Sequence, residues 1–178
     1  MKIVIVGGHL APALGLIDSL SPEDSVVFIG RKYALEGDKS LSFEYQEITG
    51  RGIPFLALTT GRFQRSFSLQ TIPSLSRMPI AAFQAIQYLR GVKPDVVLSF
   101  GGYLSVPIGV AAKFLGIPLV IHEQTLEAGL ANKLLAKIAT KICISWENSK
   151  TFFPQANVVL TGNPLKKFSS THYRSPFS

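Results

Sequence analysis

The chain has 178 residues, of which 47% are hydrophobic and 16% charged; this composition excludes a disordered protein and fits one globular domain. Its one cysteine, Cys143, excludes a disulfide framework and indicates a reducing, cytoplasmic compartment. The net charge is +7, and residues 48–178 hold fourteen Lys or Arg against four Asp or Glu, which favours a polyanionic partner.

Apolar runs alternate with helical patterns along the chain. Short runs rich in Val and Ile predict strands at residues 3–6, 26–29, 53–58, 96–99, 118–121, 142–145 and 158–160. Helical spacing predicts helices at residues 12–20, 81–89, 106–115 and 129–139. Strands that are apolar throughout are covered by helices on both faces. We therefore expect an α/β fold: a Rossmann-like, doubly wound parallel sheet built from right-handed βαβ units.

Two glycine-rich loops follow predicted strands and precede predicted helices. They are Gly7-Gly8-His9 and Gly101-Gly102-Tyr103. Ligands of open parallel sheets bind at the carboxyl ends of the strands, and glycines beside a helix N-terminus favour a phosphate or diphosphate. A plain strand-to-helix turn would use the same glycines. Two such loops in one sheet nevertheless indicate one extended anionic ligand.

Several polar residues accompany these loops. Ser105 is expected to cap the helix that follows the second loop. His122 and Glu123 are expected just beyond a buried strand, where either could act as a general base on a hydroxyl. Alternatively, these two residues are structural and shape the loop through hydrogen bonds. His9 could contact a phosphate or be an exposed loop residue.

Cofactor and metal sites find little support. There is no G-x-G-x-x-G, and Gly30-Arg31-Lys32 stands where a dinucleotide site needs an acidic residue for the ribose. No D-x-D pair occurs, and the three histidines lack ligand-like spacing. The sequence therefore predicts neither a cofactor nor a metal.

Four segments together resemble the MurG family of N-acetylglucosaminyltransferases. They are D-V-V-L-S-F-G-G-Y-L-S-V-P at 95–107, I-P-L-V-I-H-E-Q at 117–124, A-G-L-A-N-K-L-L-A at 128–136 and T-G-N-P at 161–164. The resemblance implies an inverting GT-B enzyme of two Rossmann-like domains that needs no metal. Its N-terminal domain takes an undecaprenyl-diphosphate-linked muramyl acceptor, and its C-terminal domain takes UDP-GlcNAc.

The resemblance also implies roles for individual residues. Both glycine-rich loops would face the acceptor diphosphate, with His9 helping to position it. The motif His122-Glu123-Gln124 would lie near the acceptor hydroxyl, with His122 or Glu123 as the base. The expected substrate-binding set is completed by Ser105, Thr125, Asn132 and Asn163.

The sequence departs from the family pattern in three ways. The loop Gly7-Gly8-His9 is shorter than the usual G-G-T-G-G-H, and Thr125 stands where many members have Asn. The chain also stops fourteen residues after Pro164. We therefore expect residues 1–165 to be an N-terminal domain and 166–178 a polar tail or the start of a linker. UDP-GlcNAc would then bind to a missing C-terminal domain or to a partner subunit. A non-catalytic subunit that holds the lipid-linked acceptor is the alternative.

The stretch at residues 61–68 resembles the basic segment of the family. Arg62, Phe63, Arg65, Phe67 and Arg77 lie in a stretch without acidic residues. This composition predicts contact with an anionic membrane on its cytoplasmic face. A nucleic-acid partner is not expected, because the aromatic residues are interleaved with aliphatic ones. No run reaches the roughly 18 apolar residues of a membrane helix, and the first residues do not resemble a signal peptide.

Overall fold

The computed structural model describes residues 1–34, 40–58, 78–154 and 157–164. These residues form a seven-stranded parallel sheet in the order β3-β2-β1-β4-β5-β6-β7. The strands are β1 (Lys2–Val6), β2 (Ser25–Gly30), β3 (Phe55–Ala57), β4 (Val96–Ser99), β5 (Leu119–Glu123), β6 (Lys141–Ile144) and β7 (Val158–Leu160). The helices are α1 (Leu10–Ile17), α2 (Phe43–Gly50), α4 (Met78–Val92), α5 (Ser105–Phe114), α6 (Leu130–Leu135) and the 3-10 helix η1 (Glu147–Phe152). The predicted α/β fold is confirmed.

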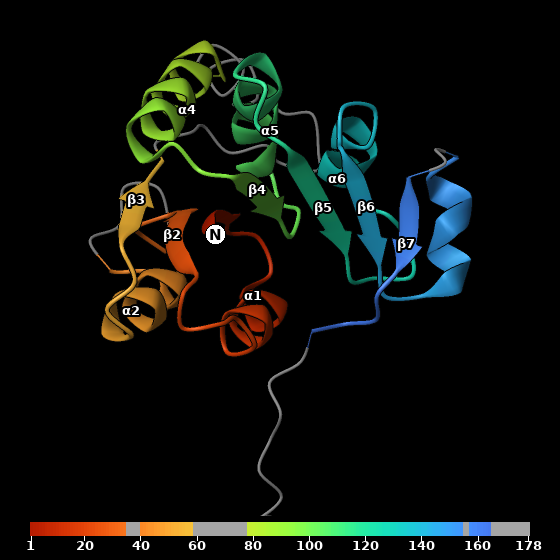
Figure 1. Cartoon of the computed structure of the whole chain (residues 1–178), viewed down its shortest axis with the longest axis horizontal. Helices are drawn as coiled ribbons and strands as arrows, with labels where there is room; N and C mark the ends of the chain where they lie inside the picture. The colour runs from red at the N-terminus through yellow and green to blue at the C-terminus, as the bar shows by residue number, and fades with distance from the viewer. Residues whose placement is uncertain (35–39, 59–77, 155–156, 165–178) are drawn as a thin grey trace, which may run out of the picture.

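Helices cover both faces of the sheet. Helices α4, α5 and α6 lie on one face, and α1 and α2 lie on the other (Figure 1). In β1, Val4 and Val6 join a core cluster with side chains of α4, α5 and α6, whereas Ile3 and Ile5 join a second cluster with side chains of α1 and α2. Burial on both faces explains why the strand reads as one continuous apolar run. All carboxyl ends of these parallel strands lie at one edge, which we call the carboxyl edge.

The observed elements differ from the predicted ones mainly at their ends. Strand β5 continues to Glu123, so the expectation that His122 and Glu123 lie beyond the strand is wrong. Helix α6 ends at Leu135 rather than at residue 139. Helix α2 was not predicted, because Ile48 is its one buried residue and its sequence therefore shows no apolar stripe.

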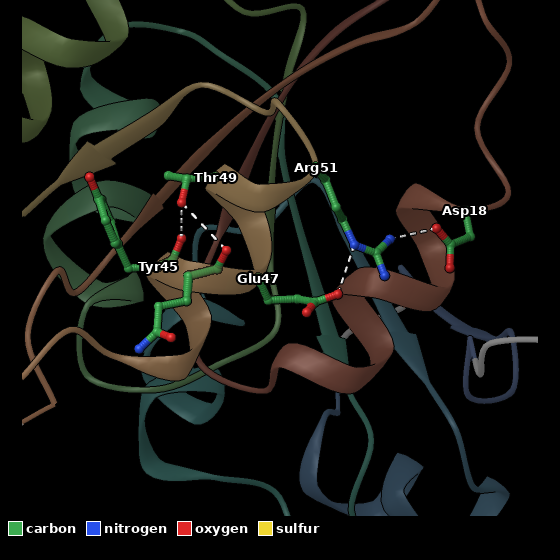
Figure 2. A network of polar contacts seen from close by, with 6 residues as sticks. Asp18, Tyr45, Glu47, Thr49 and Arg51 are labelled. Atoms are coloured by element: carbon green, nitrogen blue, oxygen red, sulfur yellow. Dashed lines mark hydrogen bonds and ion pairs between the residues drawn. The ribbon is translucent and has the colours of Figure 1, made fainter.

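A polar network joins α1 to α2 on the same face (Figure 2). Arg51, which follows α2, donates to Asp18 at the end of α1 over 2.7 Å and to Glu47 within α2 over 2.9 Å. At the start of α2 the Ser42 hydroxyl accepts from the backbone N–H of Tyr45 at 3.0 Å. Each partly exposed ion pair contributes at most about 1 kcal/mol. Together these contacts connect α2 to the end of α1.

Several predictions concern residues outside the described part of the chain. The membrane-facing residues Arg62, Phe63, Arg65, Phe67 and Arg77 all fall there, as does the tail at 166–178. Membrane contact therefore stays a prediction, and so do the domain limits. Among the described residues, no helix has the length and apolar character needed to cross a bilayer.

Candidate functional site

The two glycine-rich loops touch each other at the carboxyl edge. Strand β1 pairs with both β2 and β4, and the register places Val6 opposite Ile29 and Ser99. The loop after β1 therefore lies directly beside the loop after β4. An ideal Cβ on Gly8 would lie 2.2 Å from the carbonyl oxygen of Gly101. The convergence that the topology predicts is thus present.

Glycine is required in these loops for two reasons. Gly101 and Gly102 have φ angles of +85° and +79°, which side chains rarely adopt. Gly8 has an ordinary φ, but its neighbour at 2.2 Å is backbone and cannot rotate away. The close contact between the loops therefore depends on the absence of a side chain at Gly8.

Replacing Gly8 by Ala is expected to lower the free energy of unfolding by about 1–3 kcal/mol, because the added methyl group overpacks the contact with Gly101. Gly50→Ala is the matched control, because a Cβ there meets nothing within 4 Å. Thermal and urea unfolding measure both changes. A Gly8→Ala variant as stable as Gly50→Ala would contradict the observed loop contact.

The backbone amides of the loops are not equally available to a ligand. The N–H of Gly7 donates to the carbonyl of Ile29 at 2.8 Å, and that of Gly101 donates to the Ser99 hydroxyl at 3.1 Å. The N–H groups of Gly8 and Gly102 have no acceptor among the described residues. Each glycine pair at the carboxyl edge therefore has one amide without an acceptor among the described residues.

Ser105 stabilises the second loop but does not cap a helix as predicted. The N-cap of α5 is Leu104, which has no side-chain cap, and Ser105 is the first helical residue. Its buried hydroxyl donates to the carbonyl of Gly101 at 2.5 Å. Ser105 therefore acts on the conformation of the loop and not on the orphan amides of α5.

His9, the last residue of the first loop, is exposed. It is the N-cap of α1, and its Nδ1 lies 3.1 Å from the carbonyl oxygen of Phe100, the residue before the second loop. A carbonyl oxygen can only accept, so this contact places the proton on Nδ1. In the neutral ring Nε2 then carries the lone pair. His9 is therefore an oriented imidazole with a free proton acceptor at the carboxyl edge.

His122 has a different environment from His9. It is 4% exposed, packs beside Phe100 and lines a cleft of about 380 Å³ on the α1 face of the sheet, with Leu16, Cys143 and Asn163. Its Nε2 lies 3.0 Å from the carbonyl oxygen of Gly162, whereas its buried Nδ1 has no hydrogen-bond partner. Burial lowers the pKa of His122, and the Gly162 carbonyl and Gln124 offset this only in part. The imidazole is therefore neutral near pH 7.

Glu123 points to the opposite face of the sheet from His122 and is 2% exposed. Its carboxylate accepts from the N–H of Thr125 at 3.0 Å, the Thr125 hydroxyl at 2.5 Å, the N–H of Gly129 at 2.9 Å and the side-chain amide of Asn132 at 2.9 Å. Burial alone would raise the pKa of Glu123, but these donors outweigh it and lower the pKa. Glu123 is therefore an ionised group that organises the loop from Gln124 to Gly129.

The other predicted residues lie around this framework. Asn132 is buried and connects Glu123 to the backbone of β5, and an ideal Cβ on Gly101 would lie 3.3 Å from its side chain. The carbonyl of Gln124 accepts from the Trp146 indole at 3.1 Å. Thr125 is exposed at the turn, and Asn163 lines the cleft on the α1 face. The predicted residues therefore divide between the carboxyl edge and the cleft.

Sequence reasoning missed two charged residues at the carboxyl edge. The Arg31 guanidinium lies over the ring of Tyr103, 5.8 Å from its centroid. The Glu44 carboxylate accepts from the N–H of Arg31 at 3.3 Å and lies against Gly7 and Gly30; burial raises its pKa. Arg31 directly follows β2, the strand next to β1, and this position is a signal from which a role at the carboxyl edge could be predicted. In the sequence, Arg31 was interpreted only as evidence against a dinucleotide site.

Comparison with known proteins identifies the family. Residues 6–144 match the glycosyltransferase family 28 N-terminal domain. The UDP-N-acetylglucosamine–N-acetylmuramyl-(pentapeptide) pyrophosphoryl-undecaprenol N-acetylglucosamine transferase of Lactiplantibacillus plantarum is 40% identical over 161 residues, covering 89% of this chain and 42% of that protein. The protein of the same name from Lachnospira eligens is 35% identical over 170 residues, covering 93% of this chain and 46% of that protein. The chain thus spans less than half the length of these curated relatives.

Solved structures agree with this assignment. The crystal structure of MurG from Acinetobacter baumannii superposes with a TM-score of 0.71 at 28% identity, over 92% of this chain and 45% of that one. The UDP-GlcNAc 2-epimerase of Neisseria meningitidis gives a TM-score of 0.61 at 19% identity, over 92% of this chain and 47% of that one. It therefore shares the fold. The chain therefore belongs to glycosyltransferase family 28, whose N-terminal domain it carries, and within that family it is of the MurG type.

Proposed function

We propose that this domain is the acceptor-binding half of an inverting N-acetylglucosaminyltransferase. The acceptor is a muramyl-peptide sugar joined through a diphosphate to undecaprenol, and it binds at the carboxyl edge. UDP-GlcNAc is supplied by a further domain or by a partner subunit. The names of the relatives, which contain both this acceptor and this donor, support the choice of substrates.

The observation that carries the proposal is the orientation of His9. Its Nδ1 is engaged by the Phe100 carbonyl, so Nε2 is free to accept a proton between the two glycine-rich loops. The free amides of Gly8 and Gly102 lie beside it and can donate to phosphate oxygens. A proton acceptor next to phosphate-binding groups suits a hydroxyl nucleophile on a diphosphate-linked sugar.

The reaction is then a single displacement. The hydroxyl oxygen of the acceptor attacks the anomeric carbon of GlcNAc, and the bond from that carbon to the UDP oxygen breaks. The hydroxyl proton passes to Nε2 of His9, and UDP leaves with the bonding electron pair. Of the other two candidate bases, Glu123 has its carboxylate occupied by four donors, and His122 faces the cleft on the α1 face.

Calorimetric titration tests the assignment to the acceptor half. The chain is titrated with UDP-GlcNAc and, separately, with a short-prenyl analogue of the diphosphate-linked muramyl acceptor. The acceptor analogue is expected to bind, with UDP-GlcNAc giving no saturable heat. Saturable binding of UDP-GlcNAc without binding of the analogue would contradict the proposal and assign the donor to this half.

A further inference from the structure

Arg31 extends from β2 across the first glycine-rich loop to the second. Strand β2 ends at Gly30, and the pairing of Val6 with Ile29 places Arg31 beside the β1 loop that contains Gly8. Its guanidinium lies over the ring of Tyr103, which directly follows Gly101 and Gly102. A cation over an aromatic face is held by the electrons of the ring. The guanidinium is therefore positioned where the two loops meet.

The charge of this guanidinium is available to a ligand. Within the described ranges, no carboxylate lies at ion-pair distance from it. The carboxylate of Glu44 accepts from the backbone N–H of Arg31. Burial raises the pKa of Glu44, although the backbone N–H and the positive charge of Arg31 both act to lower it.

A diphosphate at this edge needs a cation. The two glycine pairs offer only the N–H groups of Gly8 and Gly102, which are neutral, whereas a diphosphate diester carries a negative charge on each phosphate. A guanidinium presents a rigid fork of donors that matches phosphate oxygens in pairs. Arg31 supplies such a fork directly beside the two free amides.

We infer that Arg31 binds the diphosphate of the acceptor and that the ring of Tyr103 holds its guanidinium between the two glycine-rich loops. This inference rests on the proposed function, because it assigns a residue to the diphosphate of the proposed acceptor.

Binding of geranyl diphosphate to the chain tests the inference. Arg31→Ala is expected to weaken binding about ten- to a hundredfold, the effect of losing a charge-assisted contact, and to reduce its dependence on salt. The affinity of Arg31→Lys is expected to lie between those of the unmodified chain and Arg31→Ala, because lysine keeps the charge but loses the paired donors. Arg90→Ala, which removes an exposed arginine at the end of α4, is the control and is expected to bind as the unmodified chain does.

Substitutions at Tyr103 distinguish the contribution of its ring to binding from that of its hydroxyl. Tyr103→Phe keeps the aromatic face and is expected to bind normally, whereas Tyr103→Leu is expected to weaken binding severalfold. Geraniol, which lacks the diphosphate, is expected not to bind.

Two results would overturn the inference. If Arg31→Ala is folded and binds geranyl diphosphate as tightly as Arg90→Ala, with the same salt dependence, Arg31 does not contact the diphosphate, although the domain still binds the acceptor. If the unmodified chain binds neither geranyl diphosphate nor the muramyl acceptor analogue, the proposed function fails and the inference fails with it.

Discussion

Replacing His9 by Asn is expected to lower the rate of GlcNAc transfer by about 10²–10⁴-fold, the usual contribution of a general base. The Asn side-chain amide can still donate to the Phe100 carbonyl, as Nδ1 of His9 does, but it has no basic nitrogen to receive the hydroxyl proton. Acceptor binding should therefore change little while kcat falls. Such a split between binding and rate distinguishes proton transfer from a merely structural role.

The rate can be measured in a chimaera that joins residues 1–164 of this chain to the remaining part of the Lactiplantibacillus plantarum relative. His122→Asn in the same chimaera tests the competing base. If His122→Asn abolishes transfer in a folded protein while His9→Asn retains more than about half the activity, His9 is not the base and the proposed mechanism is wrong.

Replacing Glu123 by Gln is expected to lower the free energy of unfolding by about 2–4 kcal/mol, more than Gly8→Ala does. The carboxylate accepts four hydrogen bonds, and the new amide would turn N–H groups toward the donors of Thr125, Gly129 and Asn132. Glu127→Gln is the matched control, because Glu127 is an exposed residue of the same loop. Urea unfolding measures both variants. A loss below about 0.5 kcal/mol for Glu123→Gln would contradict the structural role of the carboxylate.

The effect of Glu123→Gln should also depend on pH. The pKa of Glu123 is lowered in the folded protein, so its ionised form stabilises the fold at every pH above the pKa in the unfolded chain. This contribution is lost as the pH falls through the folded pKa. The difference in unfolding free energy between the unmodified chain and Glu123→Gln should therefore be constant near neutral pH and shrink on acidification below about pH 4.

The strands could be predicted because most of them are apolar runs that are largely buried in the sheet. β1 and β5 read as continuous Val and Ile runs, and glycines mark where strands end. Helix α2 could not be predicted in this way, because its position depends on the Ser42 cap and on tertiary contacts such as the Arg51–Asp18 pair. The spacing of apolar residues reveals a helix only when one of its faces is buried, and α2 buries only Ile48.

The candidate site was predictable in location but not in the role of each residue. Parallel topology alone brings the glycine-rich loops to one edge. It does not reveal that His122 and Glu123 point to opposite faces, since this depends on β5 extending two residues further than its apolar run. Nor does the sequence show that Glu123 is occupied by four donors or that Arg31 reaches Tyr103. These facts depend on contacts between residues far apart in the chain.

The position of the bound acceptor tests the central claim most directly. It can be mapped by NMR on the isotopically labelled chain titrated with the short-prenyl muramyl analogue. The amide signals of Gly8, His9, Gly102 and Tyr103 are expected to shift together and to saturate at one affinity. If the shifts are instead confined to the cleft residues Leu16, Cys143 and Asn163, the acceptor does not bind at the carboxyl edge and the proposed site is wrong.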